Sequence, residues 1–151
     1  MLEFLKISEA MSIALHTCVW LSQNSTSWAS ARQISREMGF SQHHFAKVVQ
    51  QLVKAGLLET ERGPSGGARL ARPAQKITLF DIYLATDGGS GKPGCLLKHT
   101  ICQGNTCALG QSLTRENAKL ITLFKKQTVH AVAQSIKPTI HTTSKKKAPV
   151  V

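Results

Sequence analysis

The stretch AGLLETERGPSGGARLARP, residues 55–73, decides the fold class of this chain. Leu57, Leu58 and Thr60 suit a strand, and the segment from Arg62 to Leu70 is rich in glycine and proline. Together they predict a β-hairpin with a tight tip. Arginines lie on both arms, and few bulky side chains crowd the tip, so backbone N–H groups can approach phosphates closely. A hairpin of this kind that follows a helix-turn-helix is a wing.

Upstream of the hairpin, the sequence predicts two short helices joined by a tight turn. Ser30 begins the first of them as its N-cap, and Gly39 fits a left-handed C-terminal cap. Ser41 is placed to cap the next helix, and Phe40 and Phe45 are spaced as a hydrophobic staple. Two such helices joined by a glycine turn make a helix-turn-helix candidate.

The outer face of the second short helix carries side chains rich in hydrogen-bond donors, which suit phosphates and base edges. Judged alone, this face is also compatible with a simple solvated surface, but the hairpin that follows favours DNA reading. On the helices we expect DNA contacts from Arg32, Ser41, Gln42, His43, His44, Lys47 and Gln50. On the wing we expect them from Arg62, Ser65, Gly66, Gly67 and Arg69.

The charge of the chain agrees with a polyanionic partner. The sequence has 19 Lys and Arg against 8 Asp and Glu, a formal net charge of +11, and such an excess attracts nucleic acid. No catalytic constellation, nucleophile elbow or P-loop is present, so an enzyme is not expected. No apolar run approaches the ~20 residues that span a bilayer, and the N-terminus lacks the apolar core of a signal peptide. We therefore expect a cytoplasmic protein with no membrane partner.

Three cysteines follow the wing region in the spacing C-x6-C-x4-C: Cys95, Cys102 and Cys107. Nearby glycines predict a loop that can curl around a ligand. Three thiolates are a soft ligand set that suits an iron–sulfur cluster or zinc. Ordinary thiols, or a disulfide with one spare thiol, are the alternatives. Cys18 instead lies on the apolar stripe of the first helix and is expected to be a small core residue.

The remaining segments complete the predicted organisation. A helix is expected from the Thr78 cap, with Asp81 closing a capping box, to about Thr86. A last long helix is expected over residues 111–135, and its apolar stripe predicts a dimer seam, with packing onto its own domain as the alternative. In chain order, the predicted parts are a winged helix-turn-helix over 1–86, a cysteine loop over 87–110, a dimerisation helix over 111–136 and a disordered basic tail over 137–151. The predicted class is mainly α with a small β wing.

Over about residues 5–130 the chain resembles the IscR/NsrR family of bacterial winged-helix regulators. The resemblance rests on the helix-turn-helix, the wing quoted above, the helix start ITLFDIYLATDGG and the three-cysteine loop. It implies a homodimer that binds a double-stranded DNA operator. It also implies that the three cysteines hold an iron–sulfur cluster, [2Fe–2S] or [4Fe–4S], whose state tunes operator binding in response to nitric oxide, redox stress or iron–sulfur supply. Some relatives lack a cluster and sense thiols.

The fourth cluster ligand is where the chain departs from the family pattern. The family's usual spacing is C-x5-C-x5-C, and IscR-like members place a histidine where this chain has Gly110. NsrR-like members recruit a carboxylate from the first helix of the partner subunit, and Glu9 matches that position. His99, inside the loop, is the other candidate, and with the three cysteines it would complete a tetrahedral zinc site.

Three functional hypotheses follow. The favoured one is a transcription regulator, with repression as the favoured mode, whose operator binding is controlled by an iron–sulfur cluster. The alternative is a regulator of the same fold that depends on thiol oxidation or zinc and carries no cluster. The third is a cluster-carrying protein–protein module whose basic face is incidental.

Overall fold

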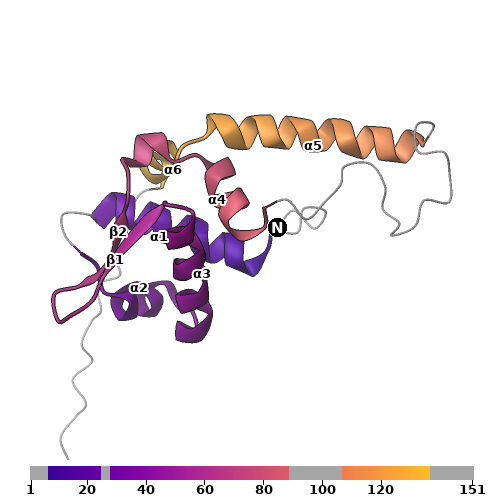
Figure 1. Cartoon of the computed structure of the whole chain (residues 1–151). Helices are drawn as coiled ribbons and strands as arrows, with labels where there is room; N and C mark the ends of the chain where they lie inside the picture. The colour runs from indigo at the N-terminus through magenta and orange to yellow at the C-terminus, as the bar shows by residue number, and fades with distance from the viewer. Residues whose placement is uncertain (1–6, 25–27, 89–106, 137–151) are drawn as a thin grey trace, which may run out of the picture.

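The computed structural model describes residues 7–24, 28–88 and 107–136. Within these ranges the chain is mainly helical with one two-stranded antiparallel sheet (Figure 1), as predicted. The elements are α1 (Glu9–Asn24), α2 (Ala31–Met38), α3 (Gln42–Lys54), β1 (Leu58–Glu61), β2 (Gly67–Leu70), the 3-10 helix η1 (Ala74–Lys76), α4 (Leu79–Thr86), α5 (Ala108–Lys126) and α6 (Val129–Ser135). A bilayer-spanning helix is absent from the described part of the chain.

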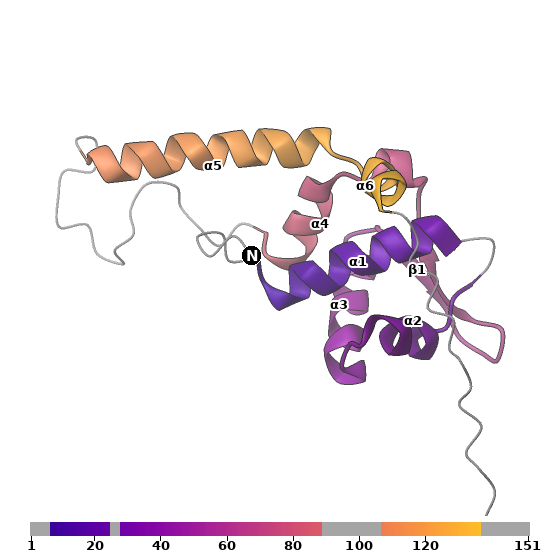
Figure 2. The ribbon, with the colours of Figure 1, turned by 180° about the vertical axis from the view of Figure 1, so that it is seen from behind.

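Helix α1 is the centre of the fold and packs against α3, α4 and α6 (Figures 1 and 2). Cys18 on α1 is fully buried, as its place on the apolar stripe predicted. Burial of such a set of apolar side chains is the main driving force for folding. The largest fully buried side chains in the described residues include Leu21, Ile34, Phe45, Leu52, Leu57, Leu58, Ile77 and Ile82.

The turn between α2 and α3 forms as predicted, except for one cap. Ser30 accepts a hydrogen bond from the Gln33 backbone N–H at 3.1 Å, and Gly39 has the left-handed φ of 71° expected of a C-terminal cap. Phe40 and Phe45 stack with ring centroids 6.3 Å apart, which confirms the staple. The predicted side-chain cap at Ser41 is wrong, because its hydroxyl makes no hydrogen bond to the first turn of α3. Ring packing, rather than a side-chain cap, supports this end of α3.

The hairpin pairs Leu58 with Leu70 and places Glu59 opposite Arg69. The segment before α2 pairs with β2, because Ala29 and Ala68 exchange both backbone hydrogen bonds, at 3.0 and 2.8 Å. At Gly67 a Cβ would lie 2.1 Å from the carbonyl oxygen of Ala29, so only glycine allows this close approach. The wing is therefore fastened to the helix-turn-helix by backbone pairing.

The predicted capping box at the start of α4 is present, since Thr78 and Asp81 exchange both hydrogen bonds. The predicted single helix over residues 111–135 is wrong, because Lys126 ends α5 and α6 begins at Val129. Thr128 forms an isolated bridge with Thr78, and the Leu79 N–H donates to the Gln127 carbonyl at 2.9 Å. This pairing with an earlier segment holds residues 127–128 extended and interrupts the helix.

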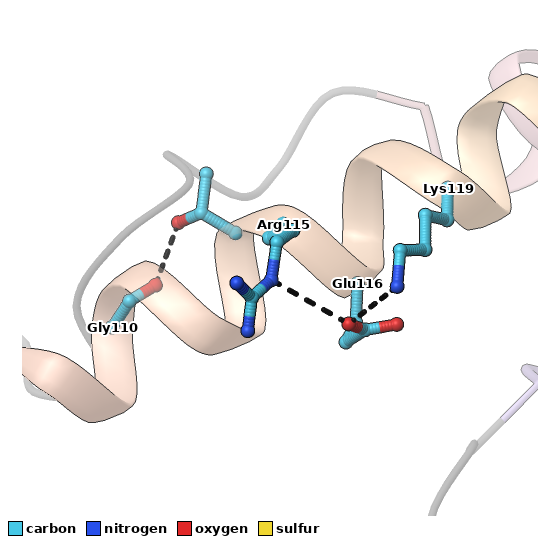
Figure 3. Close-up of polar contacts among 5 residues, drawn as sticks. Gly110, Arg115, Glu116 and Lys119 are labelled. Atoms are coloured by element: carbon cyan, nitrogen blue, oxygen red, sulfur yellow. Dashed lines mark hydrogen bonds and ion pairs between the residues drawn. The ribbon is translucent and has the colours of Figure 1, made fainter.

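Helix α5 extends away from the other helices in both views, and its C-terminal half lies next to α4 (Figures 1 and 2). In its N-terminal half several polar contacts are local to the helix, including those of Glu116 with Arg115 at 3.7 Å and with Lys119 at 2.9 Å (Figure 3). The hydrogen bond from Lys119 holds the pKa of the Glu116 carboxyl below its ordinary value. The Glu116–Lys119 pair, whose residues lie one helical turn apart, stabilises the helix without help from the rest of the fold.

Candidate DNA interface and cysteine loop

Helix α3 presents one buried face and one exposed face, as a recognition helix requires. Phe45, Val48 and Leu52 are buried in the core, which fixes the rotation of the helix. The predicted DNA contacts on the opposite side are exposed: Gln42, His43, Lys47 and Gln50, together with Ser41 before the helix and Arg32 on α2. These side chains are free to meet a duplex, and contact with DNA stays a prediction for each of them.

His44 differs from its neighbours because it is engaged within the chain. Its Nδ1 lies 3.2 Å from Oε1 of Glu9, the first residue of α1. The Glu9 side chain is 70% exposed and that of His44 is 44% exposed, so a second molecule can reach both. From the sequence, Glu9 was expected to be a cluster ligand and His44 a DNA contact at a separate site, and the structure brings them together.

The wing places its two arginines in different environments. Arg62 follows β1, is exposed and forms no ion pair within the described residues. Arg69 on β2 donates from Nε and Nη2 to Oε2 of Glu59 at 3.0 and 2.9 Å. Its guanidinium also lies over the Trp28 ring, 4.2 Å from the centroid. Arg69 is therefore held within the wing by Glu59 and Trp28, and its contact with DNA stays a prediction.

The tip of the wing is open, and its glycines have a structural role within the hairpin. Ser65 is exposed and Gly66 is partly exposed. At Gly66 a Cβ would lie 2.2 Å from the Glu61 carbonyl oxygen, so a side chain there would disrupt the hairpin. From the sequence, these glycines were expected to allow close approach to phosphates. The structure supplies a separate reason for them, and phosphate contact by Gly66 and Gly67 stays a prediction.

Of the predicted cluster ligands in the loop, the structure describes one, Cys107. It is half-buried at the N-cap of α5, where the Gly110 backbone N–H donates to its Sγ at 3.3 Å. Cys95, Cys102 and His99 lie outside the described residues. Within the described ranges no three potential ligands gather at one point. Burial raises the pKa of the Cys18 thiol to about 12, which keeps it protonated and unsuited to ligation.

The start of the cysteine loop is fastened to α1 by residues that were not predicted from the sequence as site residues. The Ser8 hydroxyl donates to Oδ2 of Asp87 at 2.8 Å, and its oxygen accepts from the Met11 N–H at 3.0 Å. Ser8 therefore caps α1 and anchors the last residue before Gly88. Ser8 could be recognised from the sequence as an N-cap, because it precedes Met11 in the first turn of α1 by three residues. No sequence pattern indicates its hydrogen bond to Asp87, 79 positions away.

Comparison with known proteins agrees with this architecture. Residues 7–135 match the Rrf2 family, described as an iron-dependent transcriptional regulator. The chain belongs to the Rrf2 family. This family agrees with the transcription regulator that the helix-turn-helix and the wing predicted.

Its relatives include an IscR and an NsrR protein, as the resemblance in the sequence implied. IscR of Vibrio campbellii is 31% identical over 118 residues, 78% of this chain and 66% of the relative. NsrR of Oceanobacillus iheyensis is 36% identical over 87 residues, 48% of this chain and 59% of the relative. The matches span from half to 70% of the length of these and the other curated relatives compared.

Solved structures confirm the fold of the regulator. CymR, the global cysteine regulator of B. subtilis, superimposes with a TM-score of 0.74 at 22% identity, over 88% of this chain and 99% of CymR. IscR of T. potens gives 0.72 at 19% identity, over 88% of this chain and 89% of that structure. At these identities the likeness establishes the winged-helix fold alone.

Proposed function

We propose that this Rrf2 regulator binds a double-stranded DNA operator as a homodimer in the bacterial cytoplasm, and that an iron–sulfur cluster on the cysteine loop controls the binding. Nitric oxide, redox stress or iron–sulfur supply is the proposed signal, and repression the favoured mode. The observation that carries the proposal is the direct linkage, through α1, between the start of this loop and the first turn of α3.

The linkage consists of two adjacent residues with two separate contacts. Ser8 holds Asp87 at the start of the loop, and its neighbour Glu9 holds His44 in the first turn of α3. A displacement of the loop start is thereby passed to the N-terminus of α1 and then to the recognition helix. Coupling through a hydrogen bond and an ion-pair contact on rigid elements is a physical route between two sites.

Two of the proposed cluster ligands, Cys107 and Glu9, are among the described residues, and both suit that role. Cys95, Cys102 and Cys107 would hold the cluster, with Glu9 of the partner subunit as the fourth ligand. Cys107 is reachable, and its sulfur accepts a backbone N–H, the kind of hydrogen bond that tunes cluster potentials. The exposed carboxylate of Glu9 can be reached by a second subunit. A bound cluster would supply redox reactivity at the loop.

The homodimer is proposed from the apolar surface of α5. Leu109 and Leu113 in its N-terminal half are 58% and 36% exposed. A mostly apolar groove between α1, α4 and the C-terminal half of α5 is also open. Its lining residues are Ile7, Met11, Phe80, Tyr83, Asp87, Asn117, Leu120, Ile121 and Phe124. A second copy is the occupant we propose, because its own protruding α5 offers a helix of complementary apolar character.

Metal analysis of protein purified without oxygen tests the cluster proposal. We expect brown protein that contains iron and acid-labile sulfide. Colourless protein with stoichiometric zinc would contradict it and favour a zinc site completed by His99. Colourless, metal-free protein whose DNA affinity changes on thiol oxidation would contradict it in favour of a thiol sensor of the same fold.

Substitution of Glu9 tests the fourth ligand. Glu9→Ala should make the cluster labile or shift its visible spectrum, with an unchanged circular dichroism spectrum, because the carboxylate ligand is lost. His44→Ala is the matched control, since it breaks the same Glu9–His44 contact but keeps the carboxylate. If His99→Ala shifts the spectrum and Glu9→Ala does not, the assignment to Glu9 is wrong.

A further inference from the structure

Arg69 on the wing is held on two sides by residues from two other segments. Both of its donated hydrogen bonds end on one oxygen of Glu59, and the Trp28 ring lies against its guanidinium. Glu59 and Arg69 are directly opposite each other in the hairpin register. The pair is also accessible, with side chains 47% and 51% exposed. The negatively charged Glu59 therefore lies beside an arginine on the surface that we propose contacts DNA.

The support under Arg69 is fixed by the backbone. Trp28 precedes Ala29, and Arg69 follows Ala68, and these two alanines exchange both of their backbone hydrogen bonds. This main-chain pairing brings the Trp28 ring and the Arg69 guanidinium together. An arginine over an aromatic face in this geometry is stabilised by a cation–π contact.

We propose that Glu59 is a specificity-determining residue of this regulator: it restrains Arg69 and screens its charge, so that Arg69 contributes to operator binding but little to binding of other DNA. The inference rests on the proposed wing contact with DNA. A guanidinium has five N–H donors, and the Nε and Nη2 groups each give one to Glu59. Donors therefore remain for one directional contact with DNA.

The physical argument is a competition for the same cation. On unrelated DNA, a free arginine neutralises whichever phosphate is nearest, and this term supplies most non-specific affinity. Arg69 must first give up its contact with Glu59, so it adds little to the free energy of binding to unrelated DNA. On the operator, the wing is seated in one register, and a side chain that is already ordered loses less conformational entropy on binding. Glu59 therefore weakens non-specific binding more than specific binding.

The experiment compares Glu59→Gln with the matched control Glu61→Gln. Glu61 lies on the same strand and the same face, two residues on, opposite Gly67 and thus without a cross-strand arginine. Each variant removes one negative charge per subunit. The probes are a duplex selected by the wild-type protein from a randomised pool and a scrambled duplex of equal length. Affinity for both is measured over a range of salt concentrations.

For Glu59→Gln we expect several-fold tighter binding of the scrambled duplex and a steeper salt dependence, by about 0.9 per released arginine. The ratio of specific to non-specific affinity should fall several-fold. Glu61→Gln should shift both affinities by a similar factor and leave their ratio unchanged. In an Arg69→Ala background, Glu59→Gln should act like Glu61→Gln, because the arginine that it releases is absent.

Three results would overturn the inference: an unchanged ratio in Glu59→Gln, an equal fall of the ratio in Glu61→Gln, or an effect that persists in the Arg69→Ala background. These differ from failure of the proposed function itself. In that case the wild-type protein would bind no duplex even at low salt, whereas failure of the inference leaves wild-type operator binding intact.

Discussion

Alanine at Lys47 or at Arg62 is expected to weaken binding to every duplex DNA and to reduce the dependence of that binding on salt. Both side chains are exposed, one on the outer face of α3 and one at the end of β1. Each lost phosphate contact lowers the slope of log affinity against log salt by about 0.9, and a symmetric dimer loses two contacts. Affinities measured against salt for selected and scrambled duplexes give both quantities.

The contrast comes from the neighbouring residues that we propose contact bases. His43→Ala and Gln50→Ala should change sequence preference, with about 1–3 kcal/mol for each good base contact, and leave the salt slope nearly unchanged. Lys76→Ala is the charge control, because Lys76 lies in η1 beside α6, away from α3. If Lys47→Ala and Arg62→Ala behave like Lys76→Ala, this reading surface is wrong. Absence of any duplex binding would favour the protein–protein module.

Alanine at Cys95, Cys102 or Cys107 should abolish the visible absorbance of anaerobically purified protein. Each variant removes one of the three proposed thiolate ligands, and the two that remain would be insufficient for a stable cluster. Iron and sulfide should fall together with the absorbance, while the circular dichroism spectrum stays that of a helical protein. Operator affinity should change in the same direction in all three variants, because each frees the same loop.

Cys18→Ala is the control for this series. Cys18 is fully buried in α1 and its thiol is held protonated, so the variant should keep its colour. The small cavity left by the sulfur should lower the free energy of unfolding by about 1 kcal/mol. Retention of a full cluster in any of the three loop variants, or its loss in Cys18→Ala, would contradict the ligand assignment.

The elements that the sequence predicted well are those determined by neighbouring residues. The Phe40–Phe45 stack and the Thr78–Asp81 capping box join residues within one or two helical turns, so their spacing is visible in the chain. The break between α5 and α6 was missed because Thr128 is held extended by pairing with Thr78, fifty positions earlier. Helical periodicity carries no information about such a partner.

The candidate site divides in the same way. Exposure of His43, Lys47 and Gln50 follows from the apolar period of α3, which the sequence displays. The pairing of Arg69 with Glu59 depends on the hairpin register, and its contact with Trp28 depends on how the wing meets the segment before α2. The Glu9–His44 contact depends on the crossing of α1 and α3. These features arise from tertiary packing, which a pattern along the sequence does not reveal.

The return of α6 to α1 has a consequence for how sensing and reading are joined. Val129 is fully buried in the same core as α1 and α3, and Gln23 of α1 donates to the Ala133 and Ile136 carbonyls at 2.8 and 3.1 Å. The segment that joins α4 to α6 is therefore held to the core at both of its ends. In the proposed function, where the cysteine loop is the sensor, a change in this segment would act on the core through both ends at once. A sensor joined to the core by a single linker would act through one end alone.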